Sequence, residues 1–261
     1  MLAGEPVSKT SNQAAGCTFS SQSYVIEPNP MNPISAKPID SVAKKYRVWD
    51  TAGLNEGDDG NVPTQEAFEN LCNLVHERGV NLLVFCMRGP RFKEISRVNY
   101  DLFWGIVCQG KVPIVVVVTG LEEEEIMDQW WDRNKTEFER RGMEFKGHAC
   151  VTTTKGKKNR EGKHLLEREY SESQRRVWQL IQKSYNPEPW QAGGGKWIDE
   201  VRTKMDEYMR RYNMRTGTER KLLPTTASDR AFLARLGRWI VDHYPKRVKQ
   251  PKRSPTMSEE S

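Results

Sequence analysis

The stretch VPIVVVVTGLE, residues 112–122, does most to decide the fold of this chain. Its first seven residues are apolar and mostly β-branched, and a second run, VNLLVFCM at residues 80–87, has the same character. Continuous apolar runs of this kind are typical of strands covered on both faces, as in a parallel sheet flanked by helices. Residues 148–152 form a weaker third candidate strand.

Helical patterns separate these runs. Apolar residues recur at helical spacing in residues 65–78, 96–107 and 165–184, and residues 123–141 run from acidic to basic, which suits the helix dipole. Upstream, residues 24–26 and 45–49 have strand-like sequences joined by a Pro-rich connection, which predicts a hairpin. We therefore expect an α/β fold with a doubly wound, mainly parallel sheet.

The composition indicates a polar protein with a modest positive charge. The hydrophobic fraction is 36%, the mean hydropathy is −0.76, and 41 basic residues against 35 acidic ones give a net charge of +6. This balance favours anionic partners without choosing among nucleotide, phospholipid surface and nucleic acid. The five cysteines are odd in number and lack C-x-x-C spacing, so we expect reduced thiols and a cytoplasmic location. The longest apolar run, residues 112–118, is too short to span a bilayer.

Beyond residue 186 the pattern changes, and we divide the chain accordingly. Residues 1–186 form the α/β domain, 187–195 a Pro- and Gly-rich linker, 196–244 a helical extension and 245–261 a disordered basic tail. The apolar stripes of the extension, at 197–212 and 232–244, either pack on the domain or contact a protein partner or a membrane surface. The basic cluster from Lys246 to Arg253 is a solvated tail or a nuclear-localisation signal, and no nucleic-acid-binding motif is present.

The motif WDTAG, residues 49–53, carries the strongest chemical signal. It follows a predicted strand and precedes a loop. The Asp50 carboxylate suits a magnesium ion, and a glycine such as Gly53 lets the backbone approach a phosphate closely. The alternative is an ordinary turn that begins at an aspartate and contains a glycine.

This sequence resembles the GTPases of the P-loop superclass over roughly residues 2–184. The motif containing Asp50, Thr51, Ala52 and Gly53 has the form of their Asp-x-x-Gly element, whose aspartate holds a magnesium-bound water and whose glycine N–H contacts the γ-phosphate. The resemblance also implies that Thr18 lies in the first switch and coordinates magnesium. The long segment 54–64, in the place of the second switch, is similar to that of septin-, dynamin- and immunity-associated G domains.

Two later elements of the resemblance concern the guanine base. Residues from Thr119 to Glu122 stand in the place of the [Asn/Thr]-Lys-x-Asp motif, in which a carboxylate accepts hydrogen bonds from the base. Gly120 departs from the family's lysine, and Glu122 is one methylene longer than aspartate. The alternative is a strand end that runs into an acidic helix. The last element, Thr153, Thr154 and Lys155, resembles the Ser-Ala-Lys motif that lines the base.

The phosphate-binding loop of the family, G-x-x-x-x-G-K-[Ser/Thr], does not occur in the 261 residues. The run GGGKW at 193–197 is no substitute, because Trp197 stands where a hydroxyl is required. In that family the strand before the loop lies in the middle of the sheet, so the resemblance implies a gap there. We expect the sequence to be an incomplete version of a longer protein, and the alternative is a sheet that has closed up.

The resemblance implies a protein that binds GTP or GDP with Mg²⁺, and this chain alone is expected to bind them poorly. A homodimer through the G domain is a further expectation. Leu54 stands where Ras-type GTPases place a water-orienting glutamine, so the sequence identifies no catalytic base. The alternative function is a non-catalytic scaffold built on a degenerate G domain.

Overall fold

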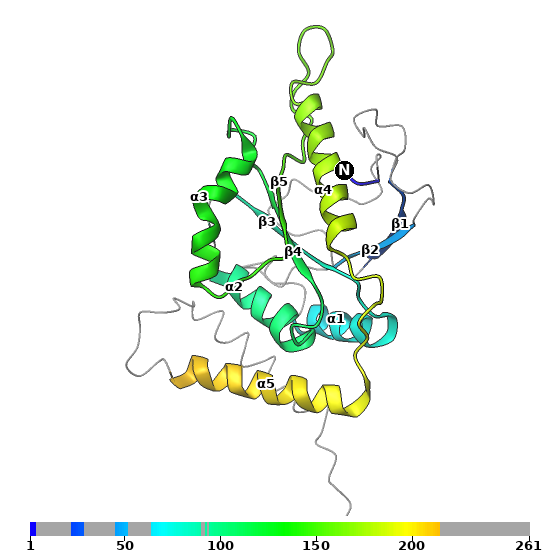
Figure 1. The fold of residues 1–261 in the computed structure, drawn as a ribbon, viewed down its shortest axis with the longest axis vertical. Helices are drawn as coiled ribbons and strands as arrows, with labels where there is room; N and C mark the ends of the chain where they lie inside the picture. Colours follow the sequence, from blue (N-terminus) through cyan, green and yellow to red (C-terminus); the bar gives the residue numbers. More distant parts are fainter. Residues whose placement is uncertain (4–21, 29–44, 52–63, 90–91, 93, 215–261) are drawn as a thin grey trace, which may run out of the picture.

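A small parallel sheet forms the centre of the molecule (Figure 1). The computed structural model describes residues 1–3, 22–28, 45–51, 64–89, 92 and 94–214. Within them, β3 (Leu83–Arg88), β4 (Ile114–Thr119) and β5 (His148–Cys150) pair in parallel in the order β3-β4-β5. The two apolar runs and the weaker third candidate are thus strands of one sheet, which confirms the prediction of an α/β fold with a parallel sheet.

The hairpin predicted upstream is also present. Strands β1 (Gln22–Ile26) and β2 (Tyr46–Asp50) pair antiparallel, with Gln22 opposite Asp50. They form a separate two-stranded sheet: among the described residues β2 pairs with β1, and β3 pairs with β4.

Helices follow the expected periodicity, with two differences in detail. The helical elements are α1 (Thr64–Arg78), α2 (Glu94–Tyr100), η1 (Asp101–Val107), α3 (Met127–Arg140), α4 (Glu167–Ser184) and α5 (Gly194–Met214). The expected helix at 96–107 is an α-helix that continues as a π-helix, in which the Cys108 N–H donates to the Phe103 carbonyl five residues back. The acidic residues from 123 precede α3, because a turn closed by the Glu124 N–H on the Leu121 carbonyl delays the helix.

The parallel sheet is covered on both faces. One face packs side chains such as Val116 and Val118 against Tyr100 of α2 and against Trp130 and Phe138 of α3. The other face packs Val115 and Val117 against α4, and the β1–β2 hairpin joins this cluster (Figure 1). Burial on both faces explains why β4 lacks the polar alternation of a half-exposed strand.

A third cluster joins α1, η1 and α5 below the sheet (Figure 1). Trp197, Val201 and Met205 of α5 are buried in it, and the Trp197 indole N–H donates to the Val107 carbonyl over 2.9 Å. The preceding segment is fixed by backbone hydrogen bonds between Val80 and Trp190. The amphipathic stretch at 232–244 and the tail at 245–261 lie outside the described residues. Among the described helices, none has the length and apolar character needed to cross a bilayer.

Candidate functional site at the carboxyl edge of the sheet

Polar residues gather where the strands end. Arg88 is the last residue of β3, Thr119 is the last of β4, and Thr152 follows β5 by two residues. Because these three strands are parallel, their carboxyl ends lie at one edge of the sheet, which is the usual ligand-binding edge of an open α/β sheet. We call this group of strand ends and the loops that follow them the carboxyl edge.

A hydrogen bond joins the loops after β4 and β5. The Thr152 hydroxyl donates to Oε1 of Glu122 over 2.9 Å, and the hydroxyl oxygen of Thr152 accepts the Thr154 N–H over 3.2 Å. Thr152 is only 1% exposed, and its one hydroxyl proton has two acceptors within reach, Oε1 of Glu122 at 2.9 Å and the Thr154 carbonyl at 3.1 Å. The Glu122 carboxylate is therefore held at the carboxyl edge by a buried partner.

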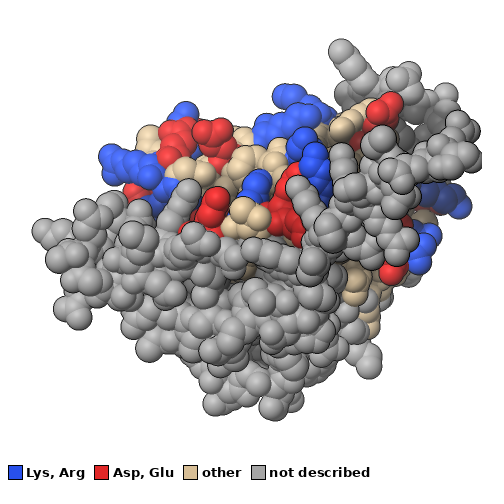
Figure 2. Space-filling model, turned by 90° about the horizontal axis from the view of Figure 1, so that it is seen from below, with Lys and Arg blue, Asp and Glu red and all other residues tan. Residues whose placement is uncertain are grey.

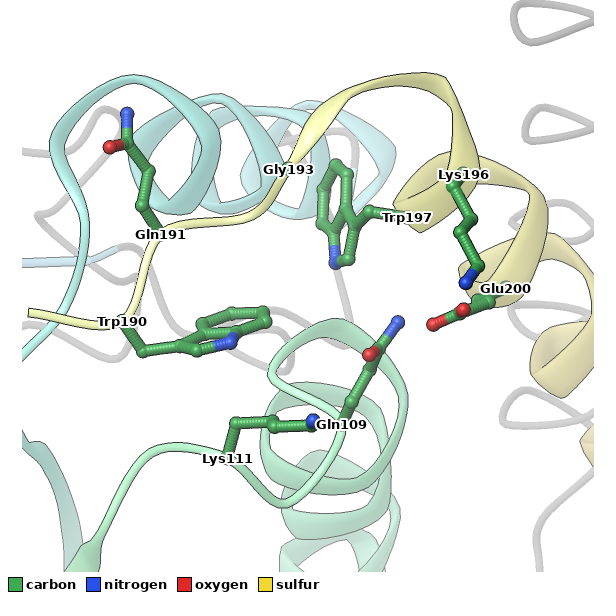
Figure 3. Close-up of a pocket in the computed structure, with 8 residues that line it drawn as sticks. All are labelled: Gln109, Lys111, Trp190, Gln191, Gly193, Lys196, Trp197 and Glu200. Atoms are coloured by element: carbon green, nitrogen blue, oxygen red, sulfur yellow. The ribbon is translucent and has the colours of Figure 1, made fainter.

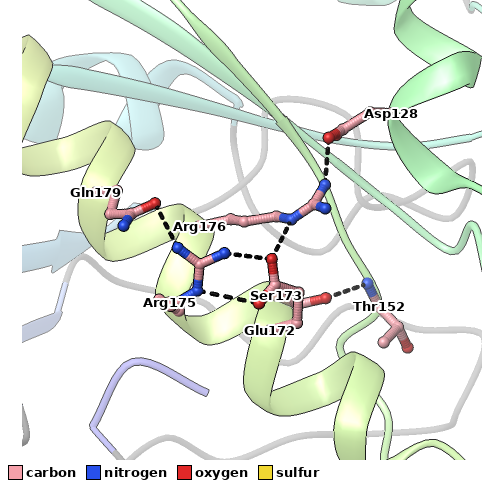
Figure 4. A network of polar contacts seen from close by, with 7 residues as sticks. All are labelled: Asp128, Thr152, Glu172, Ser173, Arg175, Arg176 and Gln179. Atoms are coloured by element: carbon pink, nitrogen blue, oxygen red, sulfur yellow. Dashed lines mark hydrogen bonds and ion pairs between the residues drawn. The ribbon is translucent and has the colours of Figure 1, made fainter. Parts of the chain in front are cut away.

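Helix α4 holds the backbone of Thr152 in place (Figure 4). The buried Ser173 hydroxyl accepts the Thr152 N–H over 3.1 Å. Next to it, Glu172 binds Arg176 on the same helix, and Arg176 also binds Asp128 of α3. The hydrogen bonds from Arg175 and Arg176 outweigh partial burial and lower the pKa of Glu172, so this acid stays ionised at neutral pH. The network links the two helices that cover opposite faces of the sheet.

Arg88 lies over Gly120. Gly120 has φ +74°, a conformation that side chains rarely adopt, and a Cβ built on it would lie 3.0 Å from both Cγ and Nε of Arg88. A lysine at position 120 would meet the same side chain. The cation next to position 120 is therefore Arg88 of β3. Sequence reasoning missed Arg88, since its position depends on the pairing of Arg88 with Thr119.

Asp50, the last residue of β2, lies near Cys86 of β3. Burial raises the pKa of its carboxyl group. The pKa of the Cys86 thiol is raised, and the nearby Asp50 carboxylate contributes to this through its negative charge. Thr51 follows Asp50 and is partly buried. The predicted site residues Ala52, Gly53 and Thr18 lie outside the described residues.

The remaining predicted residues are placed as follows. The Thr119 hydroxyl donates to the Met87 carbonyl over 3.3 Å, so it faces the β3 backbone. Thr153 is exposed, and the Thr154 hydroxyl accepts the Gly156 N–H over 3.0 Å. Lys155 lies 3.8 Å from a carboxylate oxygen of Glu167 on α4. Thus Glu122 and Thr119 lie at the carboxyl edge, whereas Lys155 is paired with α4.

The described residues fit a guanine nucleotide and its metal in part. Mg²⁺ is commonly held by one or two carboxylates together with substrate phosphates, and Asp50 offers one carboxylate. Among the described residues no three His, Cys, Asp or Glu side chains gather into a metal-binding cluster. A comparison with protein-family models and with curated protein sequences finds no match to either.

Proposed function

We propose that this chain is a guanine-nucleotide-binding protein of the P-loop GTPase type, and that Glu122 reads the base. The observation that carries the proposal is the hydrogen bond from the buried Thr152 hydroxyl to Glu122, which orients a carboxylate between the loops after β4 and β5. A preorganised polar group at the carboxyl edge of an α/β sheet is the expected form of a ligand-recognition element.

The chemistry of guanine suits such a carboxylate. Guanine presents two adjacent donors, N1–H and the 2-amino group, which one carboxylate can accept together. Adenine presents an acceptor at N1, so the same carboxylate would face an unfavourable lone pair. The Thr152 hydroxyl occupies one site on Oε1 of Glu122, and an ionised carboxylate has about four such sites in total.

The topology supports the finer fold proposal. A P-loop NTPase-like sheet that lacks its first strand would divide between β2 and β3, and the described strands do form two sheets divided at that point. Residues Met1, Leu2 and Ala3 pack on the face covered by α4, and the Met1 carbonyl accepts a hydrogen bond from Gln174. These three residues therefore add to the layer that covers this face.

The test is a titration of the ¹⁵N-labelled chain with GDP and GTP in the presence of Mg²⁺, observed by NMR. We expect weak, saturable shifts at residues 119–122 and 152–155 with guanine nucleotides and smaller ones with ATP. Weak affinity is expected because a glycine-rich phosphate loop supplies most of the fixed donors for a triphosphate. Equal responses to GTP and ATP, or shifts confined to other residues, would refute base reading by Glu122.

Two variants sharpen this test. Glu122→Gln keeps the size of the side chain but removes one acceptor, and should abolish the preference for guanine over adenine. Glu124→Gln is the matched control, because Glu124 lies in the same acidic segment and pairs with Arg133 instead. Loss of selectivity in both variants would indicate a general charge effect.

The second candidate function is a non-catalytic scaffold. One observation favours it: Thr119 and Lys155 already have partners within the chain. This function predicts cooperative unfolding with no change in midpoint on adding Mg²⁺ and GTP. A rise of the midpoint with guanine nucleotide alone would exclude it, because a ligand stabilises only the state that it binds.

A further inference from the structure

A cavity of about 160 Å³ lies between the end of η1 and the beginning of α5 (Figure 3). It lies toward the opposite end of the strands from the carboxyl edge, because Gln109 and Lys111 come just before the first residue of β4. Its other lining residues come from the segment before α5 and from the first turns of that helix, chiefly Trp190, Lys196 and Glu200.

Gln109 has a strained backbone at this cavity. Its φ of 54° makes it the non-glycine residue with positive φ among the described residues. The left-handed conformation costs a non-glycine residue about 1–2 kcal/mol, and helix ends normally place glycine or asparagine there. The turn itself is closed by the backbone of its neighbours, since the Gly110 N–H donates to the Trp104 carbonyl. The turn therefore needs the conformation but not the glutamine side chain.

Gln109 is unfavourable for folding in a second way, through its side chain. Its Nε2 is buried and has no hydrogen-bond partner among the described residues. A buried donor left unpaired costs about 1–3 kcal/mol. Two unfavourable features at one residue point to a use for the side chain, because unsatisfied groups and backbone strain both concentrate at functional sites.

The charges around Gln109 indicate what would pair with it. Lys111 and Lys196 extend toward the cavity with Gln109, and one carboxylate, Glu200, faces them (Figure 3). Among the described residues neither lysine lies within 4 Å of a carboxylate oxygen in an ion pair. Two ammonium groups against one carboxylate leave a local charge of +1, which suits a monoanion.

The remaining walls of the cavity are partly apolar. The indole of Trp190 presents a flat apolar surface to the cavity (Figure 3). Over the described part of the face seen from below, basic and acidic side chains are interspersed, not gathered into one basic patch (Figure 2). We propose that this cavity binds a small carboxylate with a flat apolar body, its oxygens accepting from Nε2 of Gln109 and from the two lysines.

The experiment is an NMR titration of the full chain at constant ionic strength. The probes are benzoate, inorganic phosphate and benzamidine, which matches benzoate in shape but is a cation. We expect saturable shifts of the Gln109 side-chain amide with benzoate and none with benzamidine. Shifts with phosphate but not with benzoate would overturn the carboxylate class, and no response to any anion at millimolar concentration would overturn the site.

Gln109→Gly separates binding from folding. This variant removes the donor and relieves the backbone strain, so we expect at least about tenfold weaker benzoate binding with an unchanged or higher unfolding midpoint. If Gln109 served only the fold, the midpoint would fall and the affinity would not change. If this variant fails to fold, the double variant with Lys111→Ala and Lys196→Ala, both exposed, carries the same test.

Two further variants test the charges. Lys157→Ala removes a positive charge from an exposed loop outside the cavity and should leave benzoate affinity unchanged. Glu200→Gln should raise the affinity severalfold, because it removes the negative charge that competes with the ligand. A lower affinity in Glu200→Gln would mean that the cavity takes a cation or a zwitterion, and would refute the proposal.

Discussion

Gly120→Ala tests the close contact between Gly120 and the Arg88 side chain at the carboxyl edge. At the φ of +74° found at Gly120, backbone strain destabilises an alanine by about 1–2 kcal/mol. Alanine also reduces the conformational entropy of the unfolded chain, which stabilises the folded state by about 0.4–1 kcal/mol. The new Cβ would also lie 3.0 Å from Cγ and Nε of Arg88, so that side chain must move. We therefore expect a loss of about 1 kcal/mol from strain, with a further loss from displacing Arg88.

Two control glycines separate the contributions. Gly162 has φ +79° and open space around its Cβ direction, so Gly162→Ala should show strain alone. Gly193 has open space and no positive φ, so Gly193→Ala should be neutral or slightly stabilising. Urea unfolding followed by circular dichroism gives each change in the free energy of unfolding.

A double-mutant cycle with Arg88→Ala then isolates the contact. In the Arg88→Ala background Gly120→Ala should cost no more than Gly162→Ala does, and the coupling free energy between the two sites should be non-zero. The reasoning is refuted if Gly120→Ala is neutral, or if its cost is the same with and without the Arg88 side chain.

Three other changes have defined outcomes. Ser173→Ala should lower the free energy of unfolding by about 1–3 kcal/mol, because it leaves the buried Thr152 N–H unpaired. Ser171→Ala should be nearly neutral in the same urea titration, because the Ser171 hydroxyl bonds to a carbonyl of its own helix. Trp197→Ala should cost about 3–5 kcal/mol, since it empties the core between α5 and η1; a thermal midpoint equal to that of the parent would contradict this packing. The pKa of Glu172 is lowered by hydrogen bonds from Arg175 and Arg176, so its contribution is present above the unfolded-state pKa and is lost as the pH falls through the folded value. Glu172→Gln should therefore reduce the fall in the free energy of unfolding as the pH is lowered below neutrality. The same fall in the variant and the parent would show that the ion pairs are not formed.

The fold could be predicted well where sequence pattern and burial coincide. The run at 112–118 became β4 because every residue from Ile114 to Val118 is buried. The hairpin followed from two short strand-like segments, and its register pairs Ile26 with Tyr46. The π-helical turn of η1 could not be predicted, because its apolar periodicity in the sequence is close to that of an α-helix.

The carboxyl edge was harder to predict, because its contacts join residues far apart in the chain. Glu122 was identified from its place after β4, but its partner Thr152 lies 30 residues later and precedes the segment that the sequence indicated. A polar residue at the end of an apolar strand was the available signal. Nothing in the sequence near Gln109 marks its amide as buried, since that burial depends on α5, which begins 85 residues further along the chain.

The orientation of Glu122 depends on groups that no ligand would touch. Its partner Thr152 is fixed by Ser173 of α4, and α4 is joined to α3 through Arg176 and Asp128. These bonds form a continuous path from α3 through α4 and Thr152 to the Glu122 carboxylate. If Glu122 reads the base as proposed, a variant of Arg176 that still folds should lose selectivity for guanine, although Arg176 itself is not placed to contact the nucleotide.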